Sequence, residues 1–490
     1  MKLNELVEDV LVYKQHNNVN PEISAIEMDS RKVQPGVLFA ALRGFTVDGH
    51  DFVQQAEQRG AAAILAEEPV ETKLPVIQVK DTYRALAQLA AKFYKNPTKD
   101  MNVIGVTGTN GKTTTTHLIE NIFQHAGKNI GLIGTLYTKF NDVIEESKNT
   151  TPESLLLQQK FTQMRDADVQ HVAMEVSSQA LALGRVRGTD FNIAVYTNLT
   201  ADHLDYHETM ENYKQSKGLL FSQLGNAYTD ERKAAVINID DEHSDYMTSI
   251  TSAPIITYGL SEVADVRGTD LHAGPGGTYF RMIIGDQSVD LNLKMVGRFN
   301  VYNALAAAAS AYVSGISVEE IKDSLESSKP IPGRFETVDA GQDFAVIVDY
   351  AHTADSLDNI LKTVKDLANK NVYVVVGCGG DRDRTKRPEM ARIAVQYGDE
   401  AIFTSDNPRS EDPEAILRDM RAGAEGRPYT VITDRKQAIR TAIHKAEAGD
   451  VVVIAGKGHE TYQEVAGVFH DFDDRVEASQ AIQERLAERG

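Results

Sequence analysis

The chain has 490 residues, a formal net charge of −20, and 42% hydrophobic and 25% charged residues. This length predicts about three domains, and the negative charge disfavours a nucleic-acid or anionic-membrane partner. No apolar run is long enough to span a membrane, and the single cysteine, Cys378, excludes a disulfide framework and is typical of the reducing cytoplasm.

The first predicted region, residues 1–98, carries short strand and helix patterns. We predict an amphipathic helix without a signal-peptide core over 1–15, strands over 37–42 and 61–67, and a helix over 82–94. Met28–Arg31, followed by Gly36, is typical of a turn at a strand end, and its chemistry alone favours a plain surface turn. The polar stretch 96–100 marks the boundary.

A phosphate-binding pattern opens the middle region, where residues 103–117 read VIGVTGTNGKTTTTH. The apolar run Val103–Val106 predicts a buried strand, Gly108–Thr113 a tight turn, and the residues beyond it a helix. Such a turn lets backbone N–H groups and a helix N-terminus approach phosphates. Lys112 would reach the β/γ-phosphates and the Thr113 hydroxyl would bind Mg²⁺. The first glycine of the general pattern falls on Val106, so a glycine-rich connection without a ligand stays an alternative.

Two further strand patterns end in polar residues. The strand in 169–178 ends on Glu175, and the strand in 192–207 leads into a loop with His203. Ligands of open α/β sheets lie at the carboxyl ends of strands, so both side chains should share an edge with Lys112 and could hold Mg²⁺ directly or through water. The alternatives are a solvated strand end for Glu175, an ordinary loop histidine for His203 and a surface position for Lys217.

The rest of the middle region, which we extend over 99–332, predicts shorter strands and turns over 234–295. An alanine-rich helix over 296–316 follows, with Asn300 in its first turn, and it should pack closely on a sheet. Ser328–Arg334 holds two prolines and a glycine and is the second predicted boundary.

The third region, 333–490, repeats an apolar strand followed by a polar loop four times, over 344–353, 372–388, 400–413 and 450–461. Strands that alternate with helices predict a parallel, doubly wound sheet, with the four polar loops along one edge. Basic residues concentrate in these loops, at Arg382, Arg384, Lys386, Arg387 and Arg409. They favour a carboxylate or phosphate ligand, and a solvated run of charges is the alternative.

Taken together, the motifs resemble the Mur ligase family over nearly the whole chain and in the family's order. They are GTNGKTTTTH, MEVSSQAL, TNLTADHLDYH, GRFN, PGRFE, VDYAHTADSL, GCGGDRDRTKRP, TSDNPRSEDP and AGKGHETYQ. The family's own loop is GTNGKT, so Val106 is no departure. DNPR at 406–409, together with GKGHE at 456–460, is similar to the branch that adds meso-diaminopimelate.

This resemblance implies an α/β protein of three domains. They are a UDP-MurNAc-substrate domain over 1–98, a P-loop ATPase domain with a mostly parallel sheet over 99–332, and a Rossmann-like amino-acid domain over 333–490. It implies a cytoplasmic, monomeric ligase that joins meso-diaminopimelate to UDP-MurNAc-L-Ala-D-Glu in peptidoglycan synthesis. ATP is the co-substrate and Mg²⁺ the cofactor, without nucleic acid and without membrane insertion.

The resemblance also implies site residues at matching positions. Catalytic roles fall on Lys112, Lys217 and His203. Nucleotide contacts fall on Gly108, Thr109, Asn110, Gly111, Lys112, Thr113, Thr114, Asn300, Arg334 and Asp349. The metal site comprises Thr113, Glu175, His203 and a carbamylated Lys217. The residues implied to bind the UDP-muramyl dipeptide are Ser30, Asn149, Thr150, Thr151, Ser177 and Arg185. The residues implied to bind diaminopimelate are Arg382, Asp406, Asn407, Pro408, Arg409, Gly456 and Glu460.

Three other functions stay open. A lysine-adding sister ligase typically lacks the arginine of DNPR, and MDSR together with DNPR argues against a folylpolyglutamate synthetase-like ligase. A P-loop NTPase switch would hydrolyse ATP without needing an amino-acid acceptor, whereas a ligase depends on its acceptor.

Overall fold

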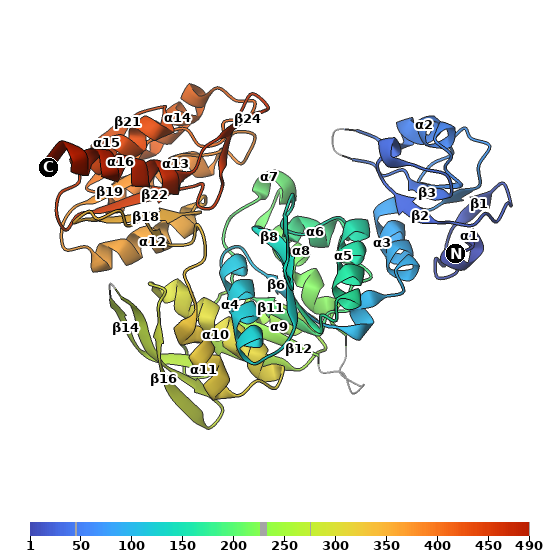
Figure 1. The fold of residues 1–490 in the computed structure, drawn as a ribbon, viewed down its shortest axis with the longest axis horizontal. Helices are drawn as coiled ribbons and strands as arrows, with labels where there is room; N and C mark the ends of the chain where they lie inside the picture. Colours follow the sequence, from blue (N-terminus) through green and yellow to red (C-terminus); the bar gives the residue numbers. More distant parts are fainter. Residues whose placement is uncertain (45–46, 226–232, 275, 490) are drawn as a thin grey trace.

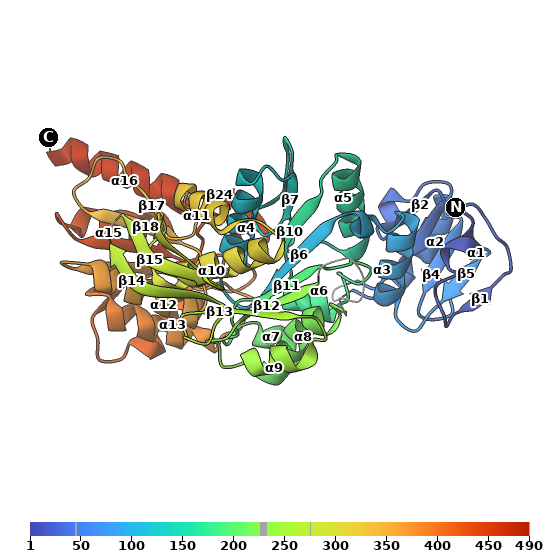
Figure 2. The same ribbon diagram turned by 90° about the horizontal axis from the view of Figure 1, so that it is seen from below.

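The computed structural model describes residues 1–44, 47–225, 233–274 and 276–489. Residue 275, inside the predicted strand-and-turn stretch, and residue 490, at the end of the third predicted region, lie outside the described residues. Three large sheets of five, eleven and six strands form three bodies along the described chain. The N-terminal and C-terminal bodies lie at opposite ends of the molecule, with the central body between them (Figures 1 and 2).

The N-terminal sheet has the strand order β1-β5-β4-β3-β2, in which β1 alone runs antiparallel to its neighbour. Its strands are β1 Lys14–His16, β2 Ala25–Glu27, β3 Val37–Ala40, β4 Ala63–Ala66 and β5 Val76–Gln78. The helices of this body are α1 Leu3–Leu6, α2 Val53–Gln58 and α3 Thr82–Phe93, with short 3₁₀ turns η1 Ser30–Lys32, η2 Gly49–Phe52 and η3 Pro97–Asp100.

The predicted helix over 1–15 is wrong beyond its first turn. Leu3, Leu6, Val7 and Val10 are buried, as the helical spacing requires, but α1 ends at Leu6. The chain then continues toward β1, whose backbone pairs with β5 at the edge of the sheet. Strand pairing therefore overrides the local helical pattern.

The central sheet has the order β16-β15-β14-β13-β12-β11-β6-β10-β7-β8-β9. The strands from β14 to β7 in this order are parallel, and antiparallel hairpins extend both edges. Its strands are β6 Asn102–Thr107, β7 Ile130–Ile133, β8 Tyr137–Phe140, β9 Val143–Glu146, β10 His171–Glu175, β11 Ile193–Tyr196, β12 Ala234–Asn238, β13 Ile255–Gly259, β14 Val266–Gly274, β15 Gly277–Ile284 and β16 Gln287–Leu293.

Helices cover both faces of the central sheet. They are α4 Lys112–His125, α5 Ser154–Asp166, α6 Ser178–Ala182, α7 Leu204–His207, α8 Met210–Ser222, α9 Ser244–Ile250, α10 Arg298–Val313 and α11 Val318–Ser327. The alanines of α10 are fully buried in one core with Leu118 and Ile122 of α4. Their small side chains let α10 pack closely on the sheet, as predicted, and hold α4 at the carboxyl end of β6.

The C-terminal sheet has the order β17-β18-β22-β19-β20-β21, parallel except for β17. Its strands are β17 Glu336–Thr337, β18 Ala345–Asp349, β19 Val372–Val376, β20 Glu400–Phe403, β21 Tyr429–Val431 and β22 Val451–Ala455, and the hairpin β23 Tyr462–Val465 and β24 Val468–Asp471 follows. Its helices are α12 Ala354–Leu367, α13 Lys386–Tyr397, α14 Pro413–Arg421, η4 Ala422–Ala424, α15 Arg435–Lys445 and α16 Asp474–Arg489.

Two separate cores lie on the faces of this sheet, one under α12, α13 and α14 and the other under α15 and α16. The doubly wound α/β fold predicted for this region is therefore confirmed. In the described part of the chain, no helix has the length and apolar character needed to cross a membrane.

Candidate active site

The phosphate-loop pattern lies between β6 and α4, where the spacing placed it. Gly108 and Gly111 both have positive φ, at 149° and 87°. A Cβ on Gly108 would lie 1.8 Å from the Thr197 hydroxyl oxygen, so only glycine fits there. The loop is tied to the end of β11, because the Thr197 hydroxyl donates to the Asn110 carbonyl at 2.7 Å. Its backbone is thereby held open at the N-terminus of α4.

Two lysines donate to one carbonyl of this loop. Lys112 Nζ lies 2.9 Å from the Gly108 oxygen, and Lys217 Nζ, which comes from α8, lies 2.6 Å from the same oxygen. Lys217 is 1% exposed, so the surface alternative for it is wrong. Burial lowers the pKa of both amines, and the charge of Lys112 lowers the pKa of Lys217 further.

A carboxylate faces these cations from the end of β10. Glu175 is buried, and its Oε2 accepts a hydrogen bond from the Thr113 hydroxyl at 3.0 Å. Arg334 Nη2, at the end of the second predicted boundary, also donates to that hydroxyl oxygen, at 3.1 Å. The solvated-strand-end alternative for Glu175 is wrong, since the carboxylate lies in a closed network with the phosphate loop.

His203 lies beside this group at the start of α7, with a left-handed φ of 53°. Its Nε2 is 3.3 Å from the Asp202 carboxylate. Partial burial, with the nearby charge of Lys217, lowers the pKa of His203 to about 3. The imidazole is therefore neutral at pH 7, the form in which a histidine binds a metal.

Asn300 and Asp349 are the other two residues outside the loop that were predicted, with Arg334, to contact the nucleotide. Asn300, in the first turn of α10, accepts from the Asn303 amide at 3.2 Å. Asp349 ends β18, accepts from the Phe335 backbone N–H at 2.6 Å, and has its pKa raised to about 6 by burial.

Two contacts of the loop were not predicted. The amide oxygen of Asn303 accepts from the Thr115 hydroxyl at 3.4 Å, and a Cβ on Gly111 would meet that oxygen at 2.3 Å. Asn110 donates to Asp355 of α12 at 2.7 Å. Asn303 could have been predicted, because residues three apart on a helix are neighbours and Asn300 was already a candidate. No local pattern indicated the long-range pair of Asn110 and Asp355.

The residues assigned to the UDP-muramyl dipeptide fall into two places. The Thr151 hydroxyl accepts from the Ser177 N–H at 3.0 Å, and Arg185 donates to the Thr151 carbonyl at 3.2 Å, so the turn at 149–151 lies beside the start of α6. Ser30 lies in the N-terminal body, where its hydroxyl donates to Gln55 at 2.6 Å. Within the described ranges, no hydrogen bond or ion pair joins Ser30 to the other five residues.

The C-terminal loops bring most residues of the last predicted group together. Asn407 donates to Glu460 Oε2 at 2.8 Å, and a Cβ on Gly456 would lie 2.6 Å from the Asp406 carboxylate. Burial raises the pKa of Glu460, and the positive charge of Lys457 opposes this. The sequence analysis missed Lys457, a fully buried lysine whose Nζ lies 3.0 Å from Glu460 Oε2. Its place in the GKGHE loop was the available signal.

Arg409 is held by the hairpin that follows this loop. Its φ is 52°, and its backbone carbonyl accepts from the Ala466 N–H at 2.7 Å. Its guanidinium donates through Nη1 to the Gly380 carbonyl at 2.7 Å, and Nε lies 3.3 Å from Glu464. In the part of the chain that the structure describes, Arg409 Nη2 forms no hydrogen bond.

The predicted basic edge divides into exposed and buried members. Arg382 is exposed and donates to the Asp381 carbonyl at 3.0 Å, while Arg384 pairs with Glu411 at 2.9 Å. The prediction that Arg387 binds a ligand is wrong, because its side chain is fully buried and pairs with Glu411 and Asp419, each at 2.8 Å. The hydrogen bond from Arg387 lowers the pKa of Glu411 to about 2.

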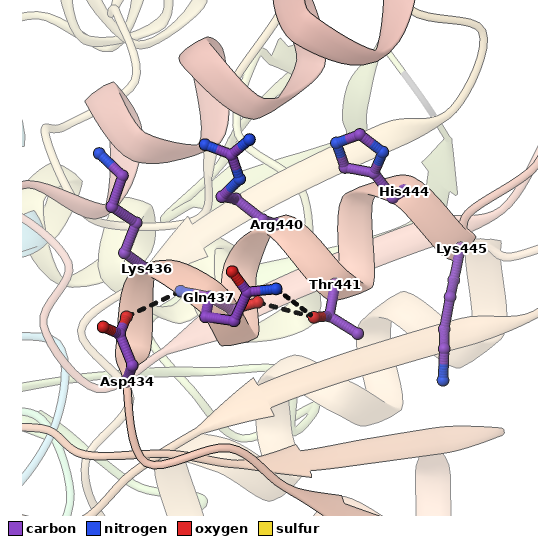
Figure 3. Close-up of a pocket in the computed structure, with 7 residues that line it drawn as sticks. All are labelled: Asp434, Lys436, Gln437, Arg440, Thr441, His444 and Lys445. Atoms are coloured by element: carbon purple, nitrogen blue, oxygen red, sulfur yellow. Dashed lines mark hydrogen bonds between the residues drawn. The ribbon is translucent and has the colours of Figure 1, made fainter. Parts of the chain in front are cut away.

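A hollow on the outer side of the C-terminal body has no part in this group. Figure 3 shows side chains of α15 and of its N-cap Asp434 that line it; the Gln437 N–H donates to Asp434, and the Gln437 side chain donates to Thr441. Its cations are paired with carboxylates of neighbouring elements, for example Lys436 with Glu477 at 2.9 Å.

Comparison with known proteins covers almost the whole chain. The Mur ligase middle domain matches residues 106–311, the Mur ligase glutamate ligase domain matches 333–458, and the Mur ligase family catalytic domain matches 22–94. The chain is 57% identical to UDP-N-acetylmuramoyl-L-alanyl-D-glutamate–2,6-diaminopimelate ligase of Geobacillus thermodenitrificans over 488 residues, 99% of this chain and 100% of that protein.

Solved structures give the same family. The structure of a UDP-N-acetylmuramoyl-L-alanyl-D-glutamate–2,6-diaminopimelate ligase is 35% identical, with a TM-score of 0.68 over 95% of each chain. The MurF ligase of Thermotoga maritima in complex with ADP is 18% identical, with a TM-score of 0.66 over 95% of this chain and 98% of that chain, and shares the fold.

The two roles found for the basic edge predict different effects on stability. Arg387→Ala should lower the free energy of unfolding by about 3–5 kcal/mol, because two carboxylates lose a buried partner. Arg384→Ala, at an exposed pair, should change it by less than about 1 kcal/mol. Urea unfolding followed by circular dichroism measures both, and equal losses in the two variants would contradict the structural role of Arg387.

Proposed function

Because this chain belongs to the Mur ligase family, we propose that it adds meso-diaminopimelate to UDP-MurNAc-L-Ala-D-Glu with ATP, in peptidoglycan precursor synthesis. Relatives that carry this activity in their names match it over 99% of its length. The observation that carries the proposal is the contact between Arg334 and Thr113, because it joins the region of the amino-acid loops directly to the phosphate loop.

The reaction needs an activated carboxyl group. The D-Glu carboxylate oxygen attacks the γ-phosphorus of ATP and ADP leaves, which gives an acyl phosphate. The amine of diaminopimelate then attacks the acyl carbon, loses a proton, and phosphate departs as the new amide forms. Two anions must meet in the first step, so cations have to offset their repulsion. Lys112 serves the transferring phosphate, while Asn300, Arg334 and Asp349 contact the nucleotide around the loop Gly108–Thr114.

The donor set at the phosphate loop fits Mg²⁺. Mg²⁺ binds proteins through one or two carboxylates and completes its shell with water and substrate phosphates. Within the described ranges, no three His, Cys, Asp or Glu side chains gather as a ready-made metal site. Thr113, Glu175 and the neutral His203 would hold the ion, which lowers the charge of the phosphates when it is bound.

Lys217 suits carbamylation. The neutral amine is the form that attacks CO₂, forming an N–C bond and releasing a proton, and burial among positive charges favours this form. The product is an anion that replaces the amine beside Lys112 and would support a second Mg²⁺.

The remaining residues define two substrate sites. Ser30, Asn149, Thr150, Thr151, Ser177 and Arg185 hold the UDP-muramyl dipeptide between the N-terminal and central bodies. Arg382, the loop Asp406–Arg409, Gly456 and Glu460 hold diaminopimelate. The far carboxylate of that amino acid needs a cation, and Arg409 Nη2 is a donor that the protein itself leaves open.

The role of Lys112 predicts a large loss of activity. Lys112→Ala should lower ligation by about two orders of magnitude or more, because the transferring phosphate loses its positive partner. Phosphate release in the presence of UDP-MurNAc-L-Ala-D-Glu and meso-diaminopimelate measures this loss. Lys128→Ala, at an exposed position past α4, is the control. Near-normal turnover in a folded Lys112→Ala protein would remove the assigned role.

The carbamate predicts chemical rescue. Lys217→Ala should be nearly inactive, and added short carboxylates should restore part of the activity by supplying the missing anion. Lys214→Ala, on the same helix, should behave like wild type. A crystal structure with both metals bound and a bare Lys217 ammonium would count against the carbamate.

The choice of amino acid depends on Arg409. With lysine bound, Nη2 of the guanidinium would be desolvated without a ligand carboxylate, at a cost of roughly 2–5 kcal/mol, so wild type should prefer diaminopimelate tens-fold to thousands-fold. Arg409→Ala should lose most of that preference, while Arg418→Ala, an exposed arginine of α14, should keep it. The measurement is kcat/KM for each amino acid. Equal use of lysine and diaminopimelate by wild type would contradict the role assigned to Arg409.

A further inference from the structure

Thr135, in the turn between β7 and β8, contacts both proposed sites of the central body. Its backbone N–H donates to Glu175 Oε1 at 2.8 Å, and its hydroxyl donates to Glu175 Oε2 at 3.0 Å. The same hydroxyl oxygen lies 3.1 Å from the hydroxyl of Thr150. No motif in the sequence analysis included this residue.

The direction of these hydrogen bonds follows from the single proton that each hydroxyl can donate. A threonine hydroxyl has one proton, and that of Thr135 is used on Glu175. Thr150 must therefore donate to Thr135, which gives a chain from Thr150 through Thr135 to Glu175. Thr113 donates to the same Oε2 from the other side, at 3.0 Å. Each member polarises the next, so a change at one end is felt at the other.

The two ends of this chain face different ligands under the proposed function. Thr150 is half-buried and belongs to the turn beside Arg185, whose guanidinium pairs with Glu153 at 2.7 Å. The charges of Glu153 and Arg185 reach Tyr83 of α3, so this turn borders the N-terminal body. The other end, Glu175 and Thr113, belongs to the nucleotide loop.

We propose that Thr135 is a positioning residue that couples binding of the nucleotide to binding of the UDP-linked acceptor, through its hydroxyl. A ligand that recruits the Thr150 hydroxyl alters the hydrogen bond received by Thr135 and so the orientation of the Glu175 carboxylate. By reciprocity, a nucleotide with Mg²⁺ that takes up Glu175 alters the donor offered at Thr150. This inference rests on the proposed function.

The test is equilibrium binding of UDP-MurNAc-L-Ala-D-Glu by calorimetry, with and without saturating ADP and Mg²⁺, in the absence of diaminopimelate. In wild type the nucleotide should change the acceptor Kd by at least about fivefold, the lower end of typical coupling. Thr135→Val keeps the backbone bond to Glu175 and removes the hydroxyl, so this ratio should fall below about twofold. Thr135→Ser restores the hydroxyl and should restore the ratio.

Thr138→Val is the matched control. Thr138 is 1% exposed on the neighbouring strand β8, and its hydroxyl forms no hydrogen bond within the described part of the chain, so the variant should keep the wild-type ratio. A full ratio in Thr135→Val, a loss in Thr135→Ser, or wild-type binding without any nucleotide effect overturns the coupling alone. Failure of wild type to bind the acceptor at all contradicts the proposed function, and the inference with it.

Discussion

Two lysine side chains donate to one backbone carbonyl, that of Gly108, and the rest of the site is arranged around them. Lys112 and Lys217 reach it from different helices, and among the described residues neither has a carboxylate as its hydrogen-bond partner. In a chain with a net charge of −20, this local excess of cations is what anionic substrates require. Burial raises the cost of leaving such charges uncompensated, so either the amines lose their protons or anions join them. In the proposed reaction, Lys217 loses its proton to form a carbamate, and the phosphates of ATP are anions that join Lys112.

The site also depends on contacts between bodies that are far apart in the sequence. Arg334 reaches Thr113, and Asp355 reaches Asn110, so the C-terminal body contacts the phosphate loop at two residues. On the other side, the turn at 149–151 faces the N-terminal body. Under the proposed function, the nucleotide, the acceptor and the amino acid would bind on three bodies and meet near this loop, as expected of an enzyme that closes on its substrates.

Local patterns predicted the parts of this structure that local physics controls. The strand, glycine turn and helix at 103–117 and the parallel strands of the C-terminal region formed as expected, because their apolar runs can only be buried in a sheet. Tertiary packing decided the rest. The spacing of α8 did not show that Lys217 points inward, and charge alone did not separate the buried Arg387 from the exposed Arg382. The helix expected over 1–15 gave way to strand pairing, and the partners of Thr135 and Asp355 lie too far along the chain for any motif to reveal them.

The proposed enzyme uses ATP to join the UDP-linked dipeptide to an amino acid, which separates a ligase from a nucleotide-driven switch built on the same loop. The most direct measurement is phosphate release from ATP with UDP-MurNAc-L-Ala-D-Glu, meso-diaminopimelate, both or neither. We expect sustained release only when both are present, in equal amount to the tripeptide product, with lysine a poor substitute. Release that continues at the same rate without either acceptor would contradict it.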